Sequence, residues 1–223
     1  MNVRTMRRAV LLGAPLLMAV SSVIHPHPPL REPGMLAFLR PRASVWMGVH
    51  LGQLVLVLLL GIALWLLTEG LEGRAATASR IATAAFLVLY GAFDSVVGIG
   101  AGLLARAVDA SPPIEPAAAA AVVDRYWLAR FDAPIGPLIA AADLAWLCAA
   151  VAAAVALRAG GASRSAAALL VVAGIAFAID HPAPTGTIGM LAFFAAVVLL
   201  LRDGRIPSAA RARSDVRETN GSA

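Results

Sequence analysis

The stretch Val49–Leu67, VHLGQLVLVLLLGIALWLL, decides the fold of this chain. It lies within a segment free of charged residues, Ala43–Thr68, which exceeds the roughly 20 apolar residues that a membrane-spanning helix needs. The whole chain shares this character, because 60% of its 223 residues are hydrophobic, 14% are charged and its mean hydropathy is +0.82. Such values are typical of chains whose solvent is lipid, and they indicate a polytopic membrane protein.

Further apolar runs along the chain predict an all-α transmembrane helix bundle of about six spans, occupying residues 1–201. We expect the spans at about 9–25, 45–68, 81–107, 134–157, 165–180 and 185–201. The last two runs are short and share the connection DHPAP, so a re-entrant hairpin is an alternative, although Arg164 and Arg202 at their far ends favour two crossings. Residues 202–223 are polar and lack aromatic side chains, which predicts a disordered cytoplasmic tail.

The distribution of arginine predicts the orientation of the bundle. All 18 basic residues are arginine, which together with abundant alanine indicates a bacterium with a GC-rich genome. Twelve arginines lie before the first span, in the second and fourth loops and in the tail, whereas six lie in the first and third loops, counting Arg106 at the end of the third span. Since cytoplasmic loops carry the excess of arginine, both termini are expected in the cytoplasm and the protein in the plasma membrane. Arginines that flank apolar runs indicate the lipid bilayer as partner and no nucleic acid.

Two segments next to the spans need separate interpretation. The first run has a basic start and ends in AVS, which also fits a cleaved signal peptide; we favour an uncleaved anchor. In the third loop, Pro116 is suited to the first turn of a helix that follows it. Val123, Trp127 and Phe131 share one face of that helix, so we expect it on the outer membrane surface, anchored by its aromatic residues.

Two aspartates fall within predicted spans, where a charged side chain is costly and marks a functional hypothesis. Asp94 lies about midway between Arg80 and Arg106, which predicts a position near the middle of the bilayer. Gly98 and Gly102 follow it on one side of the helix and allow another helix to approach closely. Asp143 lies in the outer half of the fourth span. We interpret both acids as a candidate ion or proton site, with hydrogen bonding between packed helices as the alternative.

The four histidines all map to the same side of the membrane in the predicted topology. His25 and His27 end the first span, His50 lies early in the second, and His181 follows Asp180 in the fifth loop. Imidazole and carboxylate groups are acceptable ligands for a divalent metal, so we consider His50, His181, Asp180 and His25 as rim residues or metal ligands. Their spacing matches no metal signature, however, and the neighbouring prolines also fit simple helix ends. A haem is less favoured, because the sequence lacks a clear pair of facing helical histidines.

Three segments together carry a resemblance: VHLGQLVLVLLLGIALWLL around His50, YGAFDSVVGIGAGLL around Asp94 and DHPAPTGTIGMLAFFAA around His181. The chain resembles an uncharacterised family of small polytopic membrane proteins of actinobacterial type, with about six helices. The resemblance covers most of the spans and implies no activity, cofactor or role for any residue.

The function that we expect is binding or passage of a proton, metal ion or small solute at a polar cavity of histidine and aspartate that faces the extracytoplasmic side. Two other classes stay open. One is a membrane-embedded enzyme, either a metal or haem oxidoreductase or a hydrolase; the other is a non-catalytic assembly partner whose acids specify helix packing. The sequence leaves a homo-oligomer open.

Overall fold

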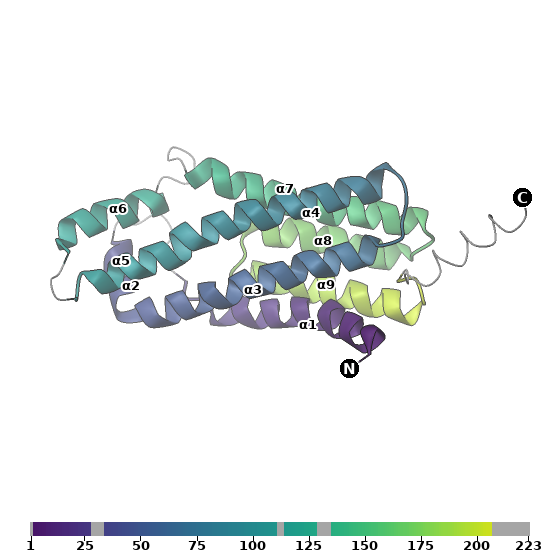
Figure 1. Cartoon of the computed structure of the whole chain (residues 1–223), viewed down its shortest axis with the longest axis horizontal. Coiled ribbons are helices and arrows are strands. Elements are labelled where there is room, and N and C mark those ends of the chain that lie inside the picture. Colours follow the sequence, from purple (N-terminus) through teal and green to yellow (C-terminus); the bar gives the residue numbers. More distant parts are fainter. Residues whose placement is uncertain (1, 28–33, 111–113, 129–134, 207–223) are drawn as a thin grey trace, which may run out of the picture.

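The computed structural model describes residues 2–27, 34–110, 114–128 and 135–206, and these residues form a helical bundle without strands (Figure 1). The helices follow in the order α1 (Val3–Ile24), α2 (Met35–Leu39), the 3₁₀-helix η1 (Arg40–Arg42), α3 (Ala43–Thr68), α4 (Arg74–Phe93), the π-helix η2 (Asp94–Gly100), α5 (Ala101–Ala107), α6 (Pro116–Leu128), α7 (Ile135–Ala159), α8 (Arg164–Ile179) and α9 (Thr185–Arg202). The predicted all-α fold is confirmed.

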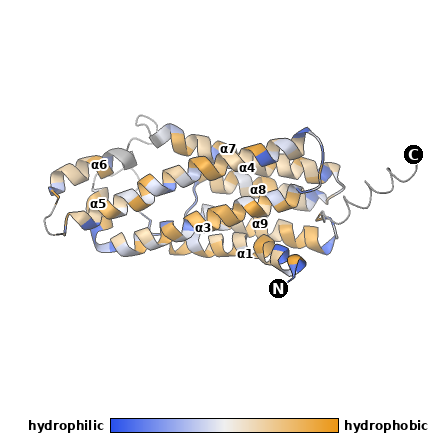
Figure 2. Cartoon of the chain, viewed as in Figure 1, coloured by the Kyte–Doolittle hydropathy of each residue, from blue (hydrophilic) through white to orange (hydrophobic). Residues whose placement is uncertain are grey.

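Five helical segments in the described part are long and apolar enough to cross a membrane. These are α1, the continuous segment α2–η1–α3, the continuous segment α4–η2–α5, α7 and α9. Helix α8 is also apolar, but its 16 residues extend about 24 Å, which is less than the roughly 30 Å of a bilayer core. Figure 2 shows hydrophobic residues along most of the bundle, with hydrophilic residues gathered near the helix ends.

Several helices begin earlier than the spans predicted from the sequence. The first begins at Val3, where the side chain of Asn2 accepts a hydrogen bond from the backbone N–H of Thr5 at 2.8 Å. The segment containing α3 is helical from Met35, and the segment containing α4 from Arg74. Helix ends are fixed by such caps and by turns, whereas hydropathy reports only the apolar part of a helix.

The six longer helices form a closed ring of neighbours. Along this ring α1 packs on α3, α3 on α4, α4 on α7, α7 on α8, α8 on α9, and α9 returns to α1. The turn after α7 lies near Leu71 at the end of α3, whereas Ala183, in the turn after α8, donates a backbone hydrogen bond to Ser22 at the end of α1. The two turns therefore lie at opposite ends of the bundle, and α1 begins at the end where α9 stops (Figure 1).

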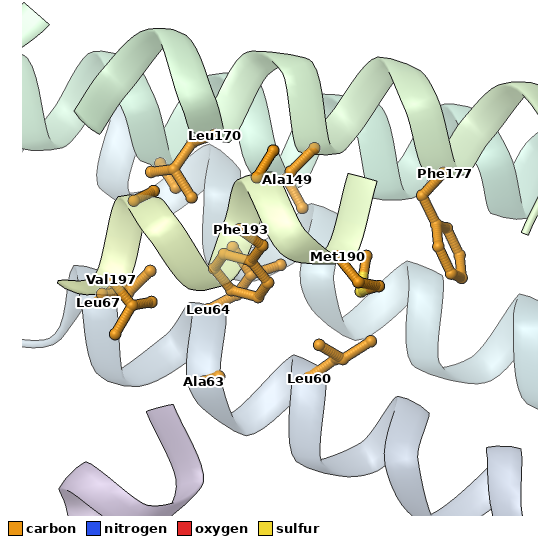
Figure 3. Packing of buried hydrophobic residues seen from close by; sticks show 14 of the residues in the cluster. Leu60, Ala63, Leu64, Leu67, Ala149, Leu170, Phe177, Met190, Phe193 and Val197 are labelled. Carbon is orange, nitrogen blue, oxygen red and sulfur yellow. The ribbon is translucent and has the colours of Figure 1, made fainter. Parts of the chain in front are cut away.

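The centre of this ring is a continuous apolar core. Figure 3 shows part of it, with Leu60, Leu64 and Leu67 of α3 and Met190, Phe193 and Val197 of α9 in one cluster. Helix α1 contributes Leu11, Ala14 and Met18, so it is an integral part of the bundle. Side chains of Phe86, Trp146 and Phe177 fill the middle of the core from three different helices.

A smaller second core lies beyond one end of the ring, where α2, α5 and α6 meet the start of α3 (Figure 1). We call this region, formed by α2, α5 and α6, the cap. Asp124 of α6 fixes this cap, because its carboxylate accepts the backbone N–H of Met35 at 2.8 Å. Val123, which we expected on the membrane-facing side of this helix, is buried in this core and packs on protein. The side chain of Trp127 and all of Phe131 lie outside the described part of the chain.

Candidate functional site

A buried histidine–aspartate pair joins α3 to η2. His50 Nδ1 lies 2.6 Å from Asp94 Oδ1, and the two side chains are 3% and 0% exposed. An ionisable group is stable at such depth only when it is hydrogen-bonded or paired. The pairing therefore satisfies two groups from segments 44 residues apart and fixes how α3 and η2 pack.

The π-helix η2 brings Asp94 to His50 of α3. η2 begins at Asp94, and Trp46, one turn before His50, donates its indole N–H to the backbone carbonyl of Gly98 at 2.7 Å. A side chain at Gly98 would overlap the ring of His50, and one at Gly102 would overlap Met47. Such π-helical turns are often found at functional sites, since the wider turn displaces side chains from their α-helical directions.

Two further imidazoles lie beside the pair: His25, which contacts His50, and His181, which contacts His25. His25 follows the last residue of α1, is 3% exposed, and its ring centroid lies 5.0 Å from that of His50 and 5.2 Å from that of His181. His27, which is exposed, has its ring centroid 6.5 Å from that of His25. The first and fifth loops therefore meet at this site, and His27 Nε2 also lies 2.8 Å from the carbonyl of Ala183.

The hydrogen-bond partners determine which nitrogen carries the proton in two of these imidazoles. His25 Nδ1 lies 2.8 Å from the carbonyl oxygen of Pro26, which can only accept, so Nδ1 donates and Nε2 of the neutral ring carries a lone pair. By the same reasoning, Nε2 of His27 donates to Ala183. Burial, then the charge of His50, lowers the pKa of His25 to about 3, which keeps this ring neutral.

Several buried polar atoms at this site have no hydrogen-bond partner among the described protein groups. They are His25 Nε2, His50 Nε2, Asp94 Oδ2, the hydroxyl of Tyr90 and both amide atoms of Gln53. Gln53 lies one turn after His50 on the same face of α3 and is fully buried. Buried polar groups of this kind normally bind water or a small ligand, so the site has unused hydrogen-bonding capacity.

Tyr90 is a further buried polar residue close to the pair and to His181. It is fully buried one turn before Asp94, and its ring centroid is 5.8 Å from that of His181. Asp94, Asp143 and Asp180 all act electrostatically on its hydroxyl. The structure therefore places Asp143 of α7 and Asp180 at the end of α8 around the same polar region as Asp94, both half-buried.

The arrangement of the imidazoles can be compared with what a bound metal ion or haem would require. Within the described ranges, no group of three or more His, Cys, Asp or Glu side chains is arranged to hold a metal ion. The rings of His25 and His50 meet edge to face at an interplanar angle of 86°, and their 5.0 Å separation leaves no room for a porphyrin between them. These histidines thus contact one another and Asp94 directly.

The site lies closer to one end of the bundle than the sequence suggested. Asp94 is midway along α4–η2–α5, but this segment continues past the ends of α1 and α8 into the cap. The His50–Asp94 pair is level with His25, which directly follows α1. Counting from flanking arginines assumes that a helix ends at the membrane surface, and this helix extends beyond its neighbours.

Sequence reasoning missed two residues of the site, Trp46 and Tyr90. Both could have been found from helical spacing, because Trp46, His50 and Gln53 recur on one face of α3 and Tyr90 precedes Asp94 by one turn. No protein-family model, curated protein or solved structure matches this chain. The function proposed for it therefore rests on the geometry of the site.

Proposed function

We propose that this chain is an integral membrane protein that reversibly binds a proton at the buried His50–Asp94 pair. The observation that carries the proposal is the 2.6 Å contact between two titratable groups that are almost completely shielded from solvent. In the pair, neutral His50 donates its Nδ1 proton to the Asp94 carboxylate, so the pair carries one negative charge, and uptake of one further proton makes it neutral. Because the pair is buried, its net charge, and with it the uptake of that proton, is sensitive to the surroundings.

Among the cargoes considered from the sequence, a proton agrees best with the geometry. His50 Nδ1 is engaged by Asp94, and the neighbouring imidazoles meet through ring contacts. The remaining buried acceptors, His25 Nε2, His50 Nε2 and Asp94 Oδ2, all have the chemistry to accept a proton or a hydrogen bond from water.

The proposed orientation places the histidines on the extracytoplasmic side of the plasma membrane. The excess of arginine lies at the opposite end of the bundle, where α1 begins and α9 stops. Under the positive-inside rule that end is cytoplasmic, and so are both termini.

Infrared difference spectroscopy of the purified protein between acidic and neutral pH tests the proposal. The carbonyl band of a protonated carboxyl group should change with pH in the native protein and should be missing in Asp94→Asn, which keeps a hydrogen-bonding side chain of the same shape. The matched control is Asp109→Asn, since Asp109 forms an exposed ion pair with Arg40. An unchanged band in a folded Asp94→Asn protein would contradict the proposal.

A purely structural role for the pair is the second candidate function. It is favoured by the close approach of Gly98 and Gly102 to side chains of α3, which is typical of tight helix packing. A packing role predicts the same pH-difference spectrum for the native protein and for Asp94→Asn, because the pair would then keep one protonation state throughout.

A further inference from the structure

A line of imidazoles leads from solvent to the buried pair. His27 is exposed, His25 is 3% exposed, and His50 contacts Asp94 directly. Successive ring centroids are 6.5 Å and 5.0 Å apart, separations that a side-chain rotation or an intervening water molecule can bridge. Burial of the polar groups thus increases step by step along one path.

The opposite direction contains no comparable path in the described part of the bundle. Along α3 no ionisable side chain lies between His50 and Glu69, and along α4 none lies between Arg80 and Tyr90. The buried hydroxyls of Ser79 and Thr83 are engaged with backbone carbonyls of Ala149 and Ser79. Leucine and aromatic side chains fill the remaining space, as Figure 3 shows for Leu60, Leu64 and Phe193.

We infer that the His50–Asp94 pair exchanges protons with one end of the bundle only, through His25 and His27, and is sealed from the other end by the apolar core. This inference rests on the proposed proton-binding function and defines it further. The pair is then a one-sided proton-binding site that responds to the pH at the His27 end, and the chain is not a proton channel.

The transfer can be written with every proton assigned. A proton taken up at His25 Nε2 passes to His50 Nε2, and the proton on His50 Nδ1 moves to Asp94 Oδ1. His25 returns to its neutral form, His50 is neutral with its proton on the other nitrogen, and Asp94 is a neutral carboxylic acid. Because a proton is unfavourable on buried His25, it stays there only briefly, and we expect this step to limit the rate.

Other titratable groups face this path from the surrounding elements. His181 contacts His25 from the loop after α8, and Tyr90 of α4 contacts His181. Asp143 of α7 and Asp180 act electrostatically on Tyr90. These groups affect the proton affinity of the pair, so the test must compare rates as well as final amplitudes.

Trp46 provides the readout, because its ring centroid lies 4.5 Å from that of His50. The shift of the proton on His50 and the loss of the negative charge on Asp94 change the electrostatic environment of the indole and therefore its fluorescence. The experiment is a rapid change of external pH on proteoliposomes containing the full chain. Trp46→Phe identifies the part of the signal that comes from this residue.

Orientation in the vesicles is measured independently. In a Cys148→Ser background, Asp109→Cys places a thiol at the exposed end of α5, beside the cap and at the His27 end. A membrane-impermeant maleimide then labels only molecules whose His27 end faces outward. The fraction labelled gives the fraction expected to respond quickly to external pH.

Two variants test the route while keeping its hydrogen bonds. His25→Asn retains a donor for the Pro26 carbonyl, and His27→Gln retains one for Ala183, but neither new side chain titrates. We expect His25→Asn to respond at least about tenfold more slowly with the same final amplitude, a change in barrier of about 1.4 kcal/mol. His27→Gln should have a smaller effect, since water can replace an exposed group.

The outcomes separate the route from the function. A fast response limited to the labelled fraction, slowed in His25→Asn, supports the inference. An equally fast response from molecules of both orientations, or an unslowed His25→Asn, overturns the one-sided route and leaves the proton-binding function standing. A Trp46 signal that is missing, or that persists in Asp94→Asn, overturns the proposed function itself.

Discussion

Gly98 lies directly against the imidazole of His50, so that the narrowest contact between η2 and α3 is also the wall of the buried pair. The carbonyl of the same glycine accepts the indole N–H of Trp46. One backbone position thus packs on the titratable ring and fixes the side chain next to it. Packing and chemistry cannot be changed independently at this position.

Gly98→Ala should destabilise the protein and disturb the pair together. Its new methyl group would overlap the His50 ring, and overpacking of a filled interior costs about 1–3 kcal/mol. Denaturant unfolding in detergent measures the loss. Gly100→Ala is the matched control, because its methyl group meets only Ser95 O at 3.6 Å, an ordinary contact. Equal stability of the two variants would show that His50 moves aside freely.

A double-mutant cycle measures the coupling between His50 and Asp94. Asp94→Leu alone should cost about 3–5 kcal/mol, because removing one partner leaves a buried polar group unpaired. His50→Leu with Asp94→Leu should cost less than the sum of the two single changes, since no unpaired group remains. Additive free energies of unfolding would mean that the two side chains do not interact in the folded protein.

Protonation of His25 should make the fold sensitive to acid. The pKa of His25, which directly follows α1, is lowered from 6.5 to about 3 in the folded protein, so between these values the unfolded chain binds a proton that the folded chain does not. Stability therefore falls as the pH falls through this window, and above it His25 contributes no pH dependence. His25→Asn should flatten the profile of unfolding free energy against pH within the window. A profile with the native slope would assign the acid sensitivity to other groups.

Asp124→Ala should loosen the cap without affecting the six-helix ring. The lost hydrogen bond to the backbone of Met35 caps α2, and removal of such a cap costs about 1 kcal/mol. Limited proteolysis should then cut near α2 faster than in the native protein. Asp203→Ala serves as the control, because Asp203 forms an exposed ion pair with Arg202 at 3.6 Å, which contributes little to stability. Identical cleavage rates in both variants would show that Asp124 does not hold the cap in place.

The sequence was sufficient to predict the helical bundle, because an apolar run of about 20 residues has few alternatives to a spanning helix. It was less informative where helices continue beyond the apolar runs. Arg40, Pro41 and Arg42 suggested a loop, yet they form a helical turn that connects α2 to α3. A proline is tolerated in the first turn of a helix, so its presence did not exclude this conformation.

Asp94 and His50 could be chosen from the sequence as candidate site residues, but their contact with each other could not be predicted. Which residue of α3 faces which residue of η2 depends on the register between two helices, and that register is set here by Trp46 and Gly98 as much as by the pair. The π-helix had no recognisable signal in the sequence, although its wider turn alters the directions of the side chains from Asp94 to Gly100. Membership of an actinobacterial-type family stays a prediction.

The unequal lengths of the helices have a consequence for the choice of membrane. Helix α9 extends roughly 27 Å and α8 about 24 Å, whereas α4–η2–α5 extends roughly 50 Å. The short helices end at the level of the histidines, so on their side of the molecule a thick bilayer would bring lipid tails up to His181, and a thin one would leave it among headgroups and water. The acyl chain length of the lipids thus determines how much water reaches the entrance to the buried pair, without any change in the protein.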